Sequence, residues 1–227
     1  MSLLTRHADG LWTADAPVRL FGALEIGTRM TVARLGNGDL WVHSPIAPSA
    51  VRGELDPLGP VKHIVAPNLY HHLFAGPFRD AYRQARLWGA PGLAKKRRDL
   101  RFDAVLGSEP PPEWAADLDQ LLIEGSMLGE VVFLHRRSRT LISSDLVARV
   151  AAAANFPARV YARVFGFSKQ HGVPHLLKLG YRDRASAKRS LEKILDWDFD
   201  RLLLAHGPLV ESGAKEVVRR AFGWLLK

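Results

Sequence analysis

Histidine and aspartate side chains follow three apolar runs whose composition is typical of β-strands. His71 and His72 follow the first run, Asp145 follows the second, and His206 follows the third. In a layered α/β protein, loops converge and ligands bind where strands end. Imidazole and carboxylate groups that meet there from three distant segments are suitable ligands for a divalent metal. The sequence therefore predicts a metal site, but it says much less about the substrate.

Each of these residues also has a simpler explanation. Asp145 precedes a segment that we expect to be helical, and aspartate is favoured at a helix N-terminus. His71 and His72 are adjacent, so they would point to opposite faces of a strand, whereas both could converge from a loop. His206 could be an ordinary hydrogen-bonded loop residue. We expect His206, Asp145 and at least one of the two adjacent histidines, with His72 favoured, to belong to the site.

The chain contains no cysteine. Disulfides, thiolate metal ligands and a cysteine nucleophile are therefore excluded. A metal would have to be held by histidine, aspartate, glutamate and water, and this donor set favours Zn²⁺, Mn²⁺ or Fe.

Length and composition indicate a globular protein. At 227 residues the chain can bury a full core, and its hydrophobic share of 47% and charged share of 24% are ordinary. No apolar run approaches the roughly 18 residues of a membrane span. The first nine residues lack the apolar core, about 7–15 residues long, of a signal peptide. We therefore expect a cytoplasmic protein that makes no use of a membrane.

The net charge of the chain is +9. The simpler explanation is a solvated, arginine-rich surface. The alternative is attraction of a small anionic substrate, and in that case we expect Lys95, Lys96 and Arg182 at the mouth of the site. No aromatic-interleaved RNA motif or helix-turn-helix pattern accompanies the charge, so nucleic acid is not an expected partner. The oligomeric state is not indicated.

The order of elements predicts one α/β domain over residues 1–227, made of two strand-rich halves with helices outside. Asn37-Gly38 is the strongest short signal of a β-hairpin. No linker or short repeat divides the chain, and a helical insertion is expected around 146–185. Strands are expected at 28–35, 40–43, 61–66, 87–91, 118–123, 131–135, 140–143 and 201–205, and helices at 78–85, within 146–197 and at 214–226.

From about residue 28 to 225, this order resembles the metallo-β-lactamase superfamily. The first metal loop of that family is His-x-His-x-Asp-His-x-x-Gly after a strand. A shift of one residue from the gapless alignment would place His71 and His72 in the aspartate and last histidine positions. Without gaps, the positions hold Asn68, Tyr70, His72, Leu73 and Gly76.

Two later ligand positions of the family match, and one does not. Ser126 stands where the family has the histidine of a Gly-His-Thr-x-Gly segment. The bridging aspartate at a strand end matches Asp145. The final Gly-His-Gly matches in part, as Ala205-His206-Gly207.

The resemblance implies a four-layer αββα sandwich of two mixed sheets with outer helices. It also implies that one metal, with an open water position, would be held by His71 or His72 together with Asp145 and His206. Two zinc ions of the usual kind would lack ligands. Asp145 would be the catalytic residue that also orients the attacking water. Substrate-binding roles are assigned to Asn68, Tyr70, His43 and Ser126.

These matches indicate a divergent member of the superfamily that resembles an uncharacterised domain family of that fold with a degenerate metal motif. Two main functions stay open, and a third, weaker one is nucleic-acid processing, which only the basic charge motivates. One main function is a single-metal hydrolase that directs metal-activated water at an unidentified substrate, for which an anionic small molecule is one alternative. The other is a non-catalytic module that has lost the two-metal site and binds a small molecule or a partner. The retained histidines and aspartate favour the first, and the lost ligands favour the second.

Overall fold

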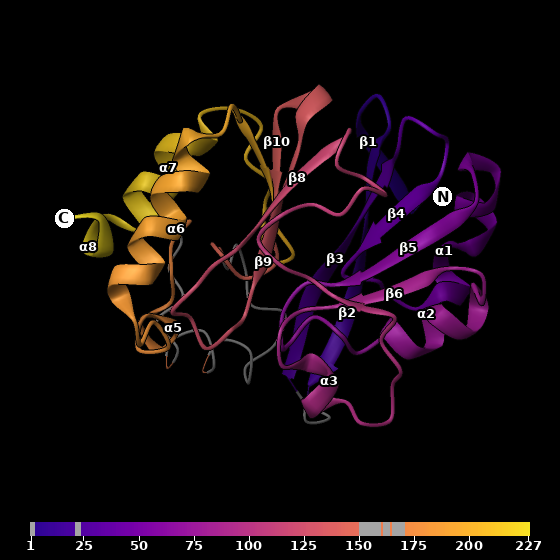
Figure 1. Cartoon of the computed structure of the whole chain (residues 1–227), viewed down its shortest axis with the longest axis horizontal. Coiled ribbons are helices and arrows are strands. Elements are labelled where there is room, and N and C mark those ends of the chain that lie inside the picture. Colours follow the sequence, from indigo (N-terminus) through magenta and orange to yellow (C-terminus); the bar gives the residue numbers. More distant parts are fainter. Residues whose placement is uncertain (1–2, 21–23, 150–159, 161–163, 165–170) are drawn as a thin grey trace.

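Two β-sheets pack face to face with helices on both outer sides (Figure 1). The computed structural model describes residues 3–20, 24–149, 160, 164 and 171–227. The four-layer αββα arrangement of mixed sheets is therefore confirmed.

The first sheet has seven strands in chain order. Its first four strands are antiparallel neighbours, and its fourth to seventh are parallel neighbours. The strands are β1 (Leu4–Ala8), β2 (Leu11–Leu20), β3 (Leu24–Arg34), β4 (Leu40–His43), β5 (Val61–Ala66), β6 (Arg86–Gly89) and β7 (Ala104–Val105). Because β4 and β5 are covered on both faces, nearly all of their residues are buried, as continuous apolar runs predict.

The second sheet has four strands in the order β11-β10-β9-β8. The strands are β8 (Leu118–Leu122), β9 (Val131–His135), β10 (Thr140–Ile142) and β11 (Arg201–Leu203). β8, β9 and β10 are antiparallel neighbours, whereas β11 lies parallel to β10. The parallel pair brings the C-terminal ends of β10 and β11 together, so the residues that follow these strands become neighbours.

Helices cover the outer face of each sheet (Figure 1). Beside the first sheet lie α1 (Pro48–Leu55), α2 (Ala75–Ala81), α3 (Leu93–Lys96) and the 3-10 helix η1 (Asp56–Leu58). Beside the second lie α5 (His175–Lys178), α6 (Arg184–Asp196), α7 (Ala214–Ala221) and α8 (Gly223–Leu226), and η2 (Arg136–Ser138) joins β9 to β10. Among the described residues, no helix combines the length and the apolar character needed to cross a bilayer.

The core between the two sheets is built on aromatic side chains. The Trp41 ring on β4 lies 4.8 Å from the Phe133 ring on β9 and 6.3 Å from the Trp114 ring. All three side chains are almost completely buried. Offset and edge-to-face contacts of this kind stabilise a core beyond the area they bury. These contacts fix the distance between the sheets, and hence between the strand ends that carry the site.

The Asn37-Gly38 hairpin is confirmed. β3 and β4 pair in antiparallel fashion, and Gly38 adopts a φ of 90°, which glycine tolerates without strain. The backbone amide of Asp39 donates to the side-chain oxygen of Asn37 at 3.0 Å. β1, β2 and the first four residues of β3 were not among the expected strands, because the sequences of β1 and β2 mix charged and apolar residues.

The expected helical insertion around 146–185 is only partly described. Residues 146–149 are not helical, so no helix begins at Asp145 and its alternative role as a helix cap is wrong. Ala148 instead pairs with Gly172 in a short antiparallel bridge. α5 and the first turn of α6 lie within the range, and most of residues 150–170 lie outside the described residues. The extent of the insertion and the single-domain organisation stay predictions.

The inter-sheet core gives a stability prediction. Phe133→Ala removes a fully buried ring and should lower the free energy of unfolding by about 3–5 kcal/mol in urea denaturation. Val105→Ala, at a side chain that is 62% exposed, is the control and should change it by less than about 0.5 kcal/mol. A loss below about 1 kcal/mol for Phe133→Ala would contradict the packing described here.

Candidate metal centre

Three side chains from three strand ends meet in one partly buried cluster. His71 follows β5 of the first sheet, whereas Asp145 and His206 follow β10 and β11 of the second. The Nε2 atoms of His71 and His206 are 3.1 Å apart. Asp145 places Oδ2 3.4 Å from Nε2 of His71 and Oδ1 3.5 Å from Nε2 of His206. Among the described residues, this is the group of histidine and carboxylate ligand atoms that could hold a metal ion.

These separations suit a tetrahedral metal site. With metal–ligand bonds of about 2.0–2.1 Å, neighbouring ligand atoms of a tetrahedral zinc site lie about 3.3–3.4 Å apart. The two Nε2 atoms are 3.1 Å apart, and each lies 3.4–3.5 Å from a different oxygen of Asp145, separations close to such an edge. Two imidazoles and one carboxylate would occupy three corners and leave the fourth for water or substrate, as in catalytic zinc sites. The residues present therefore fit one metal ion.

Hydrogen bonds on the far side of each imidazole orient Nε2 toward the centre. Nδ1 of His206 lies 2.7 Å from the carbonyl oxygen of Gly27. A carbonyl only accepts, so Nδ1 carries the proton and the neutral ring keeps its lone pair on Nε2. Nδ1 of His71 pairs with the Ser44 hydroxyl at 2.7 Å. Ser44 has a φ of 52°, an uncommon conformation for serine, and strain of this kind often accompanies functional sites.

Electrostatics keep Asp145 ionised. Burial opposes ionisation, but His71, His206 and Asn68 together hold the pKa of Asp145 well below its usual range. Burial disfavours charge on His71, but the Asp145 carboxylate outweighs it and raises the pKa of that imidazole. Burial and the neighbouring His71 lower the pKa of His206. The cluster therefore attracts one positive charge, either a proton shared between the two Nε2 atoms or a metal ion.

Asn68 shapes the loop that carries His71. Its side-chain oxygen accepts from the backbone amides of Tyr70 and His71, both at 2.8 Å. Its side-chain amide donates to Oδ2 of Asp145 at 2.8 Å. This turn is typical of asparagine, and it places His71 inside the cluster and Tyr70 outside. Asn68 thus positions two cluster residues, and its predicted contact with substrate stays a prediction.

Arg29 holds the loop that carries His206. Its guanidinium donates to the carbonyl oxygens of Leu204 and Gly207 at 2.8 and 2.9 Å. Gly207 has a φ of 95°, and a Cβ there would lie 2.1 Å from the backbone oxygen of Arg149. Only glycine fits this position, so the dipeptide His206-Gly207 has a steric cause. The sequence contains no local signal that Arg29, 177 positions away in the chain, would hold this loop.

Glu130 anchors the backbone at Asp145. Its Oε1 accepts from the amides of Ser144 and Asp145 at 2.7 and 3.0 Å. The side chain is buried, and burial together with the Asp145 charge raises its pKa to about 8. Sequence reasoning missed this residue. The available signal was an acidic residue directly before the fully buried strand β9.

His72 does not join the cluster, although the sequence favoured it over His71. Its Nδ1 lies 2.9 Å from the guanidinium of Arg97, which also donates to its carbonyl oxygen. Burial, Lys96 and Arg97 lower its pKa to about 4. The correction has a simple cause: the Asn68 turn directs adjacent residues to opposite sides, so only His71 reaches Asp145.

Three other predicted substrate contacts lie in different environments. Tyr70 is exposed, with the Lys96 ammonium 4.8 Å from its ring centre. The Ser126 hydroxyl accepts from the Leu128 amide at 3.2 Å, so it has a structural partner. His43 is buried and stacks on Trp41, and burial and His71 lower its pKa to about 3. Neither of its ring nitrogens has a partner in the described part of the chain. All three substrate roles stay predictions.

The three predicted cations differ in their contacts with the loop that carries His71. Lys96 Nζ, from α3, donates to the carbonyl oxygen of Leu69 on that loop at 2.5 Å. Lys95 is exposed on α3. Arg182 is exposed, and its backbone amide donates to Gly125 at 2.9 Å. Lys96 is thus the cation with a direct contact to the metal-centre loop, and the electrostatic role of all three stays a prediction.

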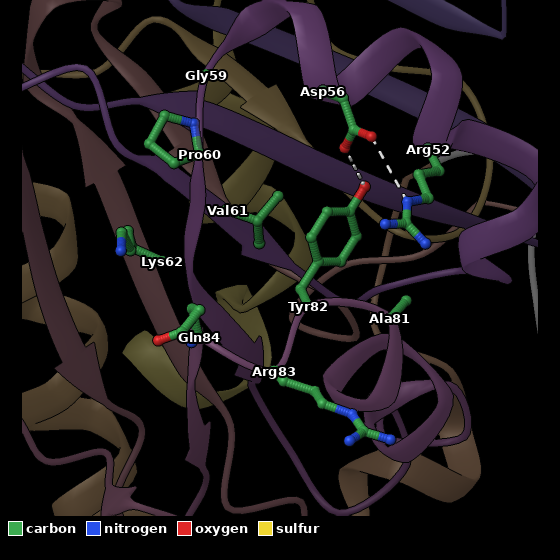
Figure 2. A pocket seen from close by; sticks show the side chains of 10 residues that line it. All are labelled: Arg52, Asp56, Gly59, Pro60, Val61, Lys62, Ala81, Tyr82, Arg83 and Gln84. Carbon is green, nitrogen blue, oxygen red and sulfur yellow. Dashed lines mark hydrogen bonds and ion pairs between the residues drawn. The ribbon is translucent and has the colours of Figure 1, made fainter.

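A separate groove of about 560 Å³ lies at the opposite end of β5 (Figure 2). Tyr82 donates to Asp56 there at 3.0 Å, and Arg52 pairs with the same carboxylate at 3.5 Å. In Figure 2, Lys62 and Arg83 point away from Tyr82 on different sides. Ligands of open α/β sheets bind beyond the C-terminal ends of strands. The cluster after β5, β10 and β11 is therefore the better candidate for a functional site.

The Glu130 anchor can be tested by stability. Glu130→Ala leaves two buried backbone amides without an acceptor and should lower the free energy of unfolding by about 2–5 kcal/mol. Glu130→Gln keeps one acceptor oxygen and should cost less than half as much. Urea denaturation of metal-free protein measures both. An equal decrease in the free energy of unfolding for both variants would show that Glu130 does not stabilise the protein through these two hydrogen bonds.

Known structures share this fold across nearly the whole chain. The metallo-β-lactamase DIM-1 exposed to ceftazidime has a TM-score of 0.67 at 11% identity, covering 97% of this chain and 96% of its own. A metallo-β-lactamase from Pontibacter korlensis has a TM-score of 0.66 at 12% identity, with 98% and 97% covered. FIM-1 from Pseudomonas aeruginosa, in a mono-zinc form, has a TM-score of 0.67 at 10% identity, with 99% and 96% covered.

Sequence comparison identifies the family. Curated proteins give no match. The sequence profile described as "Domain of unknown function (DUF4336)" matches residues 8–166, which is most of the chain and includes His71 and Asp145. The predicted relationship to a domain family of this fold is confirmed. The chain belongs to the DUF4336 domain family and has the metallo-β-lactamase fold.

Proposed function

We propose that this protein is a single-metal hydrolase whose metal is held by His71, Asp145 and His206. One observation carries the proposal: one ligand atom from each of the three residues lies within 4.8 Å of the others, and the two Nε2 atoms are 3.1 Å apart. The hydrogen bonds to Gly27 and Ser44 support it, because they orient both imidazoles with Nε2 toward the centre. The mono-zinc form of the neighbour FIM-1 is a precedent within the fold.

A divalent metal held there would lower the pKa of a bound water toward about 7 and polarise a carbonyl or phosphoryl oxygen. The chain's own groups divide the remaining work. His71 and His206 supply neutral nitrogen donors, and Asp145 supplies the negative charge. Asp145 would also accept a hydrogen bond from the attacking water and orient it. A set of two nitrogens and one oxygen suits Zn²⁺, Mn²⁺ or Fe²⁺.

A single metal agrees with the neighbours of Asp145. The side-chain amide of Asn68 donates to Oδ2 of Asp145, so one acceptor site of that carboxylate is already occupied. Tyr70 is exposed, and the hydroxyl of Ser126 accepts a backbone hydrogen bond. None of these three side chains is a ligand of the kind that zinc prefers.

We also propose a small, anionic substrate. Lys96 on α3 donates to the loop that carries His71, and its positive charge would attract an anion to this side of the protein. The proposal also keeps the expectation of a cytoplasmic protein whose partners include neither nucleic acid nor a membrane.

A second candidate is a non-catalytic binding module. One observation favours it: the cluster can satisfy itself without a metal. The raised pKa of His71 lets a proton sit between the two Nε2 atoms, and Asp145 then balances that charge. Metal binding decides between the two candidates.

Metal binding should be stoichiometric and specific to the cluster. The wild type should take up one Zn²⁺ or Mn²⁺ per chain, measured by calorimetry and elemental analysis. Asp145→Asn, His71→Ala and His206→Ala should each weaken binding by more than about 100-fold, since even an outer partner of a ligand contributes about 10–100-fold. His72→Ala is the matched control and should change the affinity little. Two metals per chain, or an equal loss for His72→Ala, would disprove this ligand set.

Hydrolysis should depend on the same metal. The Zn²⁺- or Mn²⁺-loaded protein should cleave an activated ester or phosphoester such as p-nitrophenyl butyrate or p-nitrophenyl phosphate. Chelation should abolish the activity, and added metal should restore it. Asp145→Asn should reduce kcat to the level of the metal-free protein, while His72→Ala should remain active. If loaded wild type shows no more hydrolysis than Asp145→Asn, the binding-module candidate replaces the hydrolase.

A further inference from the structure

Large apolar side chains are exposed on the loop that carries His71 and on segments hydrogen-bonded in series to it. We name four of them the mouth patch. They come from three loops or helix ends, and their exposed fractions are far above those of core residues. The mouth patch consists of Tyr70 (58%), Met127 (50%), Leu176 (41%) and Leu179 (71%). Exposed apolar side chains that gather at one place mark a binding surface more often than scattered ones do.

Backbone hydrogen bonds join the segments that carry the mouth patch. The amide of Leu69 donates to the carbonyl of Leu128 at 3.1 Å, which ties the Tyr70 loop to the Met127 loop. The amide of Met127 donates to the carbonyl of Gly180 at 2.8 Å, which ties that loop to the residues after α5. α3 and α5, which flank these loops, lie along the same edge of the sandwich (Figure 1). The mouth patch is therefore one surface, and it adjoins His71 through Tyr70.

Cations border the mouth patch on two sides. Lys96 Nζ lies 4.8 Å from the ring centre of Tyr70. Arg182 is exposed and follows Tyr181, which pairs with Ser126 beside Met127. No ion pair involves Lys96 or Arg182 within the described ranges. An apolar surface with unpaired positive charge at its border is complementary to a molecule that has a hydrocarbon part and a negative group.

We propose that the mouth patch binds the hydrocarbon chain of a monomeric anionic amphiphile, such as a medium-chain acyl compound, with its negative group near Lys96. The inference rests on the proposed function, because it names the substrate class of the same centre. It follows from the position of Tyr70, which is next to His71 in the chain and 4.8 Å from Lys96 Nζ: a hydrocarbon chain on the mouth patch would have its polar end near Lys96 and the loop that carries His71. Apolar contact provides affinity, and charge selects the anion.

Calorimetry with fatty acids below their micelle concentration tests the inference on metal-free protein. Dodecanoate should bind at least about tenfold more tightly than octanoate, because each buried methylene strengthens binding by about fourfold. Dodecyltrimethylammonium, which has the same chain and the opposite charge, should bind more weakly than dodecanoate. The double variant Met127→Ser, Leu179→Ser should lower dodecanoate affinity by at least about tenfold. Val105→Ser, at an exposed apolar residue on β7, is the control and should leave it unchanged.

The results separate this inference from the metal hypothesis. If no metal binds, the hydrolase proposal fails, but chain-length-dependent binding that the double variant weakens still supports the mouth patch. If Mn²⁺ binds, NMR signals next to the carboxylate of dodecanoate should broaden more than the terminal methyl signal. Affinity that is independent of chain length, or lowered equally by Val105→Ser, would overturn the inference. Binding to anionic phospholipid vesicles without binding to monomeric dodecanoate would also overturn it, in favour of a membrane surface.

Discussion

The Asp145 carboxylate is ionised and buried between two imidazoles, and the arrangement of the centre depends on this charge. An isolated buried carboxylate would be strongly destabilising, so neighbouring groups must compensate for the water that it loses on burial. The Asn68 amide and the His71 and His206 rings do so through short contacts. Glu130, with its pKa raised to about 8, holds the backbone without adding a second full charge at neutral pH. The centre therefore carries one negative charge, on Asp145, that a single cation can balance.

The cluster around Asp145 forms only when the two sheets pack against each other in the correct position. β5 supplies one imidazole from the first sheet, and β10 and β11 supply the other two groups from the second. The aromatic contact between Trp41 and Phe133 keeps the sheets at a fixed separation, and Arg29 reaches from β3 to the His206 loop. The centre therefore forms at the interface between the two sheets, and neither sheet alone supplies all three groups. A shift of one residue along the loop takes a histidine out of the cluster: His72, directly after His71, contacts Arg97 instead of Asp145.

Local patterns predicted much of the fold and part of the centre. Apolar runs located the buried strands, and Asn37-Gly38 located a hairpin, because both signals depend on neighbouring residues alone. The choice between His71 and His72 depends on the side-chain hydrogen bonds of Asn68 to the loop backbone, and no apolar pattern reports such a turn. Glu130 escaped notice because its partners, the amides after β10, become its neighbours only in the folded sheet.

The contact between His206 and the Gly27 carbonyl has a consequence for biosynthesis. These residues are 179 positions apart, and His71 and His206 are 135 positions apart. A nascent chain therefore lacks one corner of the centre until β11 has been synthesised and has docked beside β10. Contacts of such long sequence separation form late because their loops are costly to close. Any cation that this centre takes up through all three groups is thus acquired only after His206 has been synthesised and the second sheet has formed.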